Sequence, residues 1–216
     1  MTVKTVISPG FLWRLLLVAV ACLGMTLWCI YDAQVTYPNQ MIRAAAYNQL
    51  REATREEFAK TTDLERDPTW KNELAKRWRD LAHQRSWPGE VPGKPHDEND
   101  ILVQYGMAGV VAPIGFIFLF RYLRARKRWI EADKKGLKGS WGQSVAFDEI
   151  QVIDKKKWNN KGIAYLRYEQ DGRKRTFILD DFKFEARSTE KILRIVEKRV
   201  GFDKITNGQP LPPEKN

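Results

Sequence analysis

Two long runs of apolar residues dominate the hydrophobic pattern of the chain, at residues 15–31 and 101–120. At about 1.5 Å rise per residue, some twenty helical residues cover the roughly 30 Å hydrocarbon core of a bilayer, so each run predicts a transmembrane helix. Gln104 is the one strongly polar side chain between Ile101 and Phe120. No Asp, Glu, Lys or His lies there or between Leu15 and Tyr31, which argues against an ion path through this chain.

A basic cluster follows the second run and orients it. Because Lys and Arg beside a membrane span stay on the cytoplasmic side, we expect both termini inside and residues 33–100 outside. The first run could also be a cleaved signal peptide. Tyr31 is large where a cleavage site needs a small residue, and the run is long for a signal sequence, so an uncleaved anchor is the favoured interpretation. The cluster comprises Arg121, Arg124, Arg126, Lys127, Arg128, Lys134 and Lys135.

The charge of the chain is concentrated after the second run. The formal net charge is +10, and residues 121–216 contain 24 Lys and Arg against 14 Asp and Glu. Residues 33–100 are nearly neutral, with 11 against 12. A basic excess that begins at a predicted membrane exit is explained by topology, and it also suits an anionic lipid surface. We therefore do not expect nucleic acid as a partner.

The predicted outer segment has helical periodicity. Asn39 can cap a helix that extends to Phe58, and Asp67 with Pro68 can begin a second helix. The second helix carries a stripe at spacings of four, four and three, which marks one helix face. We favour an antiparallel hairpin that buries this stripe, and the alternative is an aromatic face offered to a partner subunit. The stripe comprises Trp70, Leu74, Trp78 and Leu81.

The second apolar run contains closely spaced small residues. Ala108, Gly109 and Ala112 permit close approach of another helix, either from the first run or from another protein.

The residues after the second run predict a compact module rich in β-structure. Residues 145–153 suggest two short strands or a bulge. Asp171-Gly172 lies between two β-prone runs and predicts a hairpin turn. A two-residue loop centred there pairs Leu166 with Phe177, Ala164 with Leu179, Tyr165 with Ile178 and Glu169 with Lys174.

An amphipathic helix is predicted to close this module. Ser188 can cap it, and Gly201 can end it. Its apolar stripe comprises Ile192, Ile195, Val196 and Val200. The Pro-rich tail beyond this helix is expected to be disordered.

The order of these elements resembles the small pleckstrin-homology-like domains of two-span bacterial membrane proteins. The resemblance rests on FDEIQVID, KKKWNNKGIAYLRY, LDDFKF and STEKILRIVEKR in that order. It implies an antiparallel sheet with a closing helix, used for docking, in a protein of the bacterial inner (cytoplasmic) membrane. The basic loop to inspect for binding comprises Lys155, Lys156, Lys157 and Lys161.

The expected organisation is therefore a membrane α-helical protein with an α-helical outer loop and a C-terminal α+β, PH-like module. Its segments are a cytoplasmic N-terminus (1–10), a first transmembrane helix (11–32), an outer helical loop (33–100), a second transmembrane helix (101–123), a basic juxtamembrane linker (124–139), the PH-like module (140–202) and a disordered tail (203–216).

The sequence offers little catalytic chemistry. It contains no phosphate-binding Gly-rich loop, no Gly-x-Ser-x-Gly and no metal-ligand cluster, so we expect no cofactor and no metal. Asp180 and Asp181 are adjacent, and neighbouring strand residues point to opposite faces. We expect a non-enzymatic docking or scaffold protein that contacts anionic lipid or a protein partner. An accessory subunit of a larger membrane complex is the alternative, and a membrane-bound enzyme is the third choice.

Overall fold

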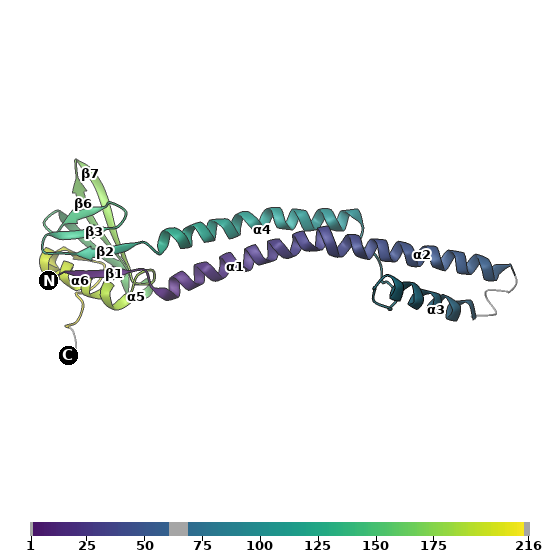
Figure 1. Ribbon diagram of the computed structural model, residues 1–216. Helices are drawn as coiled ribbons and strands as arrows, with labels where there is room; N and C mark the ends of the chain where they lie inside the picture. Colours follow the sequence, from purple (N-terminus) through teal and green to yellow (C-terminus); the bar gives the residue numbers. More distant parts are fainter. Residues whose placement is uncertain (1, 61–68, 214–216) are drawn as a thin grey trace. The chain divides into compact units, whose positions relative to one another are not determined.

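The computed structural model describes residues 2–60 and 69–213. The chain forms two compact units, one from residues 1–20 and 115–216 and the other from residues 21–114. Helices α1 (Pro9–Tyr31) and α4 (Glu98–Ala125) run from one unit into the other (Figure 1). Both helices are long and apolar enough to cross a membrane.

Helix α1 continues into helix α2 (Tyr37–Ala59) through a π-helical segment at Asp32–Thr36. Pro38 has no N–H to donate, and its ring would crowd the carbonyl four residues earlier in a regular helix. The wider π turn, in which the Tyr37 N–H donates to the Asp32 carbonyl, gives that ring room. The prediction that Asn39 caps a new helix was therefore wrong.

Helices α2 and α3 (Thr69–Gln84) form a hairpin in the unit of residues 21–114. Its centre is Trp78, whose side chain is 1% exposed. The Trp78 indole N–H donates to the Glu90 carbonyl at 3.1 Å, and the Tyr47 ring meets the indole edge-on. The predicted helix start at Asp67-Pro68 lies outside the described residues.

The segment that leads into α4 is held by side chains from α2. Arg43 donates to the carbonyls of Pro88 and Glu90, and Tyr37 stacks on His96 with ring centroids 3.7 Å apart. The Gln104 amide donates to the Tyr37 hydroxyl at 2.8 Å. The one strongly polar side chain of the second apolar run thus has a partner in its own unit.

The other unit contains two four-stranded sheets. In the first, β1 (Val3–Val6), β2 (Trp129–Ala132), β3 (Gly136–Gly139) and β4 (Ser144–Ala146) lie in sequence order and pair antiparallel. The second has the order β7 (Arg173–Asp180), β6 (Ile163–Gln170), β5 (Ile150–Lys157) and β8 (Ile205–Thr206). A short helix, α5 (Trp158–Lys161), joins β5 to β6.

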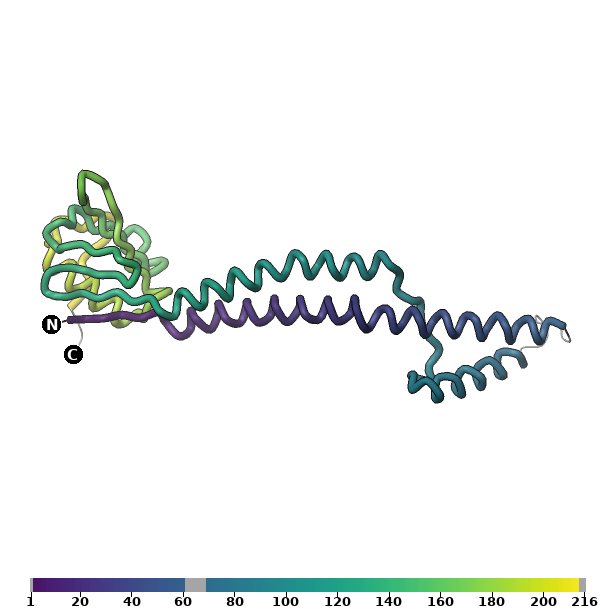
Figure 2. The backbone as a smooth tube through the Cα atoms, turned by 45° about the horizontal axis from the view of Figure 1, so that its top comes forward, coloured from purple at the N-terminus to yellow at the C-terminus, as the bar shows by residue number. Residues whose placement is uncertain are grey.

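The N-terminal strand is part of a sheet that is otherwise formed by residues after α4. Val3 pairs with Ala132 and Val6 with Trp129, and Figure 2 shows the N-terminal segment alongside the C-terminal part of the chain. The segments expected to be a separate N-terminus (1–10) and a linker (124–139) contribute β1, β2 and all of β3 to this sheet. The short strand β1 gains its order from this pairing.

The β6–β7 hairpin confirms the predicted turn and register. Leu166 pairs with Phe177, and the other three predicted pairs also form. Asp171 and Gly172 have φ angles of 54° and 68°, as a type I′ turn requires. Residues 145–153 were expected to form two short strands or a bulge, and they contain the end of β4 and the start of β5, which has a register shift between Ile150 and Val152.

Helix α6 (Ala186–Val200) closes a single core shared by the two sheets. It begins two residues before the predicted cap, and the Ser188 hydroxyl donates to the Glu185 carboxylate. Beyond it, a 3₁₀ turn (Phe202–Lys204) leads into β8, which pairs parallel to β5, so part of the tail that was expected to be disordered is structured. The core comprises Ile7, Ile130, Leu137, Ile150, Ile153, Leu166, Phe177, Leu179, Ile192, Leu193, Val196 and other buried residues.

Candidate functional site

The outward face of the β5–β6–β7 sheet carries a basic hollow of about 580 Å³. Along β6, Ala164, Leu166 and Tyr168 are buried, so Tyr165 and Arg167 point outward. We call this surface the basic face. Its cations are Lys156, Lys157, Arg167, Lys174 and Arg175.

Two predicted binding residues, Lys156 and Lys157, lie on the basic face, whereas Arg167, Lys174 and Arg175 were missed. The predicted hairpin register already implies the positions of two of them, Arg167 and Lys174. Since Leu166 faces the core, Arg167 must face outward, and so must Lys174 on the neighbouring strand.

The charges on the basic face are only partly neutralised. Asp154 accepts hydrogen bonds from the Asn207 amide and from Arg167 at 2.6 Å, and these interactions hold the pKa of its carboxyl below its usual range. The Lys157 ammonium lies 3.2 Å from the Tyr165 hydroxyl. Lys156 and Lys174 have no carboxylate partner among the described residues. The face therefore has unpaired positive charge beside a tyrosine.

Lys155 does not belong to the basic loop in which it was predicted. It is 4% exposed, because it lies two positions after the buried Ile153 on β5 and its side chain points to the same inward face. Its ammonium lies 2.7 Å from the carboxylate of Glu197 on α6 and donates to the Gln209 carbonyl. The Leu211 N–H also donates to Glu197. This buried ion pair joins β5, α6 and the tail, so Lys155 is not available to a ligand.

The other predicted basic residues are distributed over several elements. Arg121 and Arg124 lie in the last turns of α4, and Arg126, Lys127 and Arg128 connect α4 to β2. Lys134 and Lys135 lie in the β2–β3 turn, and Lys161 ends α5 and does not line the hollow of the basic face. In the β2–β3 turn, hydrogen bonds from the N–H of Lys135, from Lys138 and from the N–H of Gly136 lower the pKa of Asp133 to about 2.

The predicted stripe of α3 is used inside its own hairpin. Trp70, Leu74 and Trp78 are buried, and Leu81 is half-buried. It is therefore not a free face for a partner subunit. On α4, Ala108 is buried, Ala112 is half-buried and Gly109 is exposed, so only part of the small-residue group contacts its own chain.

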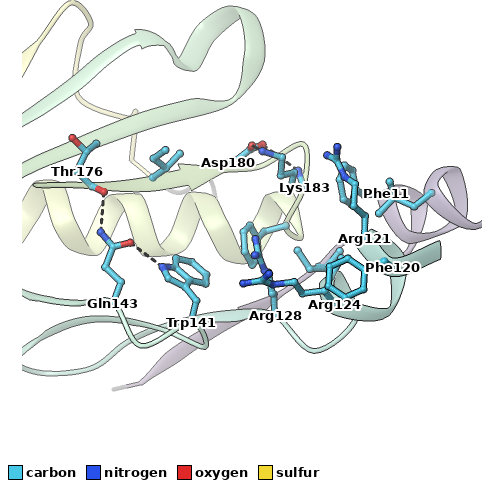
Figure 3. A pocket seen from close by; sticks show the side chains of 15 residues that line it. Phe11, Phe120, Arg121, Arg124, Arg128, Trp141, Gln143, Thr176, Asp180 and Lys183 are labelled. Carbon is cyan, nitrogen blue, oxygen red and sulfur yellow. Dashed lines mark hydrogen bonds and ion pairs between the residues drawn. The ribbon is translucent and has the colours of Figure 1, made fainter. Parts of the chain in front are cut away.

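A second hollow, of about 500 Å³, lies where α1 begins and α4 ends. We call it the helix-end cavity. Figure 3 shows Arg121, Arg124 and Arg128 lining it together with Phe11 and Phe120. Its remaining lining residues are Ile7, Leu15, Ala125, Trp141, Gln143, Thr176, Ile178, Asp180, Lys183 and Phe184.

Contacts between the β3–β4 turn and β7 shape the wall of this cavity. Gln143 donates to the Thr176 carbonyl at 2.8 Å and accepts from the Trp141 indole N–H (Figure 3). Thr176 lines both the helix-end cavity and the basic face, so the two hollows adjoin along β7.

The acidic pair is divided between two environments. Asp180 lies 2.8 Å from the Lys183 ammonium, whereas burial raises the pKa of Asp181. Within residues 2–60 and 69–213, no three His, Cys, Asp or Glu side chains gather as metal ligands would. His96 is stacked on Tyr37.

Comparison with known proteins gave no match to a family model, a curated protein or a solved structure.

Proposed function

We propose that the chain is a non-catalytic, membrane-anchored docking protein. Helices α1 and α4 cross the bacterial inner membrane, both termini of the chain lie in the cytoplasm, and the sheet unit holds an acidic protein partner at the membrane surface. The pairing of β1 with β2 carries this proposal. It joins the residues just before α1 to those just after α4, which supports a topology in which the start of α1 and the end of α4 lie on one side of a bilayer.

The connections between sheet and helices are too short to act as tethers. Residues 7 and 8 separate β1 from α1, and residues 126–128 separate α4 from β2. A docking unit connected in this way lies at the bilayer surface. The basic residues of the α4 end then reach the head groups, and on an anionic leaflet each contributes about 1 kcal/mol.

A PH-like arrangement is part of the proposal. Two sheets on a common core with a closing C-terminal helix support it. Residues 140–202 alone are short for such a domain, and β1 and β2 supply strands from outside that range. The parallel strand β8 is an addition to this plan.

The basic face is the proposed docking surface. Lys156 and Lys174 lack a carboxylate partner in the part of the chain that the structure describes. Tyr and Arg are enriched at protein interfaces, and Tyr165 with Arg167 provides both residue types. An acidic protein segment complements this surface, and charge pairs of this kind mainly set the association rate and its dependence on salt.

Site-specific photo-crosslinking in native membranes tests the proposal. A photoreactive residue at position 174 should give a discrete protein adduct that disappears in 0.5 M salt. The same residue at position 198, exposed on α6, is the matched control and should give none. No adduct at position 174, or the same adducts at both positions, would contradict docking on the basic face.

A further inference from the structure

The helix-end cavity combines positive charge with apolar walls. Four cations, Arg121, Arg124, Arg128 and Lys183, line it against one carboxylate, Asp180. Asp180 is already paired with Lys183 at 2.8 Å. The three guanidinium groups therefore face the cavity without a carboxylate within the described residues.

Aromatic rings hold two of these arginines without using their hydrogen-bond donors. Arg128 lies 5.9 Å from the centroid of the Trp141 ring, and Arg121 lies 5.9 Å from that of Phe118. A ring face attracts a cation but accepts no conventional hydrogen bond from it. The guanidinium groups thus keep donors with the fork geometry that matches a phosphate.

The apolar part of the cavity lies at the end of the predicted hydrocarbon-spanning run. Phe120 is its last residue and Arg121 follows directly, so the cavity includes the border between apolar and basic side chains on α4. Phe11 and Leu15 provide the equivalent apolar wall from α1. In a bilayer this border is the level at which phosphate head groups meet acyl chains.

We infer that the helix-end cavity is a discrete binding site for one anionic phospholipid. The phosphate lies among Arg121, Arg124 and Arg128, and the first methylenes of an acyl chain lie against Phe11, Leu15 and Phe120. A volume of about 500 Å³ suits a head group with the start of a chain. The inference rests on the membrane anchoring in the proposed function and is independent of the protein partner on the basic face.

Native mass spectrometry of the full-length chain in detergent tests this site. With phosphatidylglycerol added, one lipid per chain should be retained, at concentrations where phosphatidylcholine is not. The double variant Arg121→Gln/Arg124→Gln should weaken this binding about tenfold or more, because it removes charge-assisted hydrogen bonds to the phosphate. Arg126→Gln/Lys127→Gln is the matched control, since it removes the same charge from residues that do not line the cavity. It should change the affinity less than threefold.

A second variant tests whether the lipid needs the volume of the helix-end cavity, without changing its charge. Ile178 lines the cavity and is 44% exposed, so Ile178→Trp should fill it without disturbing the core. It should displace the lipid about as effectively as the double arginine variant.

Several outcomes would overturn the inference. Equal losses in the two double variants would mean general attraction to anionic lipid. If the unmodified chain retains phosphatidylglycerol and phosphatidylcholine equally, or retains neither lipid, the cavity is not a specific site for an anionic phospholipid. Displacement by millimolar inorganic phosphate would assign the cavity to a soluble anion. Each of these results leaves the crosslinking test at position 174 unaffected, so failure of this site is distinguishable from failure of the docking function.

Discussion

Replacing Glu197 by Ala should strongly destabilise the sheet unit, because it leaves a buried ammonium unpaired. The side chains of Lys155 and Glu197 are 3% and 2% exposed and their charges lie 2.7 Å apart. Removing one partner of a buried ion pair costs about 3–5 kcal/mol. Leu211 also loses the acceptor for its N–H. At about 1.4 kcal/mol per factor of ten, amides of β5 and α6 should exchange roughly a hundredfold to a few thousandfold faster.

Hydrogen exchange measured by mass spectrometry on the full chain in detergent provides the assay. Glu190→Ala is the matched control on the same helix. Its ion pair with Arg194 is at the surface, where Glu190 is 44% exposed, and it should cost less than about 1 kcal/mol. The double variant Lys155→Met/Glu197→Leu replaces both charges with apolar side chains and should recover most of the loss.

Two results would refute this reasoning. One is unchanged exchange of β5 and α6 in Glu197→Ala. The other is a double variant whose loss equals the sum of the losses in Lys155→Met and Glu197→Leu, because partners in direct contact should not act independently.

Three further predictions follow from the turn, the buried carboxylate and the topology. Gly172→Val should cost the sheet unit about 1–2 kcal/mol and lower its melting temperature, because Gly172 has φ +68°, whereas Gly172→Asn should be tolerated. Asp154 has a pKa lowered mainly by the Asn207 side chain. The ionised carboxylate therefore stabilises the fold at any pH above 3.8, the ordinary pKa of the group. This contribution is lost as the pH falls below 3.8 and through the lower pKa of the folded state. Asn207→Ala should therefore make the melting temperature fall less steeply with acid below pH 3.8. Cysteines at the exposed positions Ala75 and Asn160 should react with an impermeant reagent from opposite sides of the membrane. Labelling of both positions from one side would contradict the two-span topology.

The features that the sequence predicts well are local. The turn at Asp171-Gly172 determines the register of its hairpin, because a two-residue loop leaves few alternatives. Helix α6 shows a full apolar face within fifteen residues. The lengths of α1 and α4 follow from composition. Each of these depends on neighbours in sequence.

The features that the sequence did not reveal depend on distant partners. Strand β1 has four residues and pairs with a strand more than 120 positions away, so its β-branched Val3, Thr5 and Val6 favour a strand but nothing near it in the sequence identifies the partner. The sequence did not indicate that Lys155 points inward, because three consecutive lysines are typical of a solvated loop. The helix-end cavity needs residues from α1, α4, the β3–β4 turn and β7. Such a site becomes visible only when β1 joins the two ends of the chain.

The most direct test of the central claim is a disulfide between β1 and β2. Lys4 and Glu131 are directly opposite in the sheet, and opposed residues of an antiparallel pair have Cα atoms about 4.5–5.5 Å apart, within the range of a disulfide. Cysteines at both positions, with Cys22 and Cys29 replaced by Ala, should crosslink on mild oxidation of the chain in membranes. Lys138 is opposite Glu131 on the next strand, roughly 10 Å from Lys4, so cysteines at positions 4 and 138 are the control.

Non-reducing electrophoresis, after cleavage of the chain between the two cysteines, reads out the bond. A sheet built from both ends of the chain predicts near-complete linkage for positions 4 and 131 and none for positions 4 and 138. No linkage for the first pair, or equal linkage for both, would contradict the shared sheet and with it the docking unit at the membrane surface.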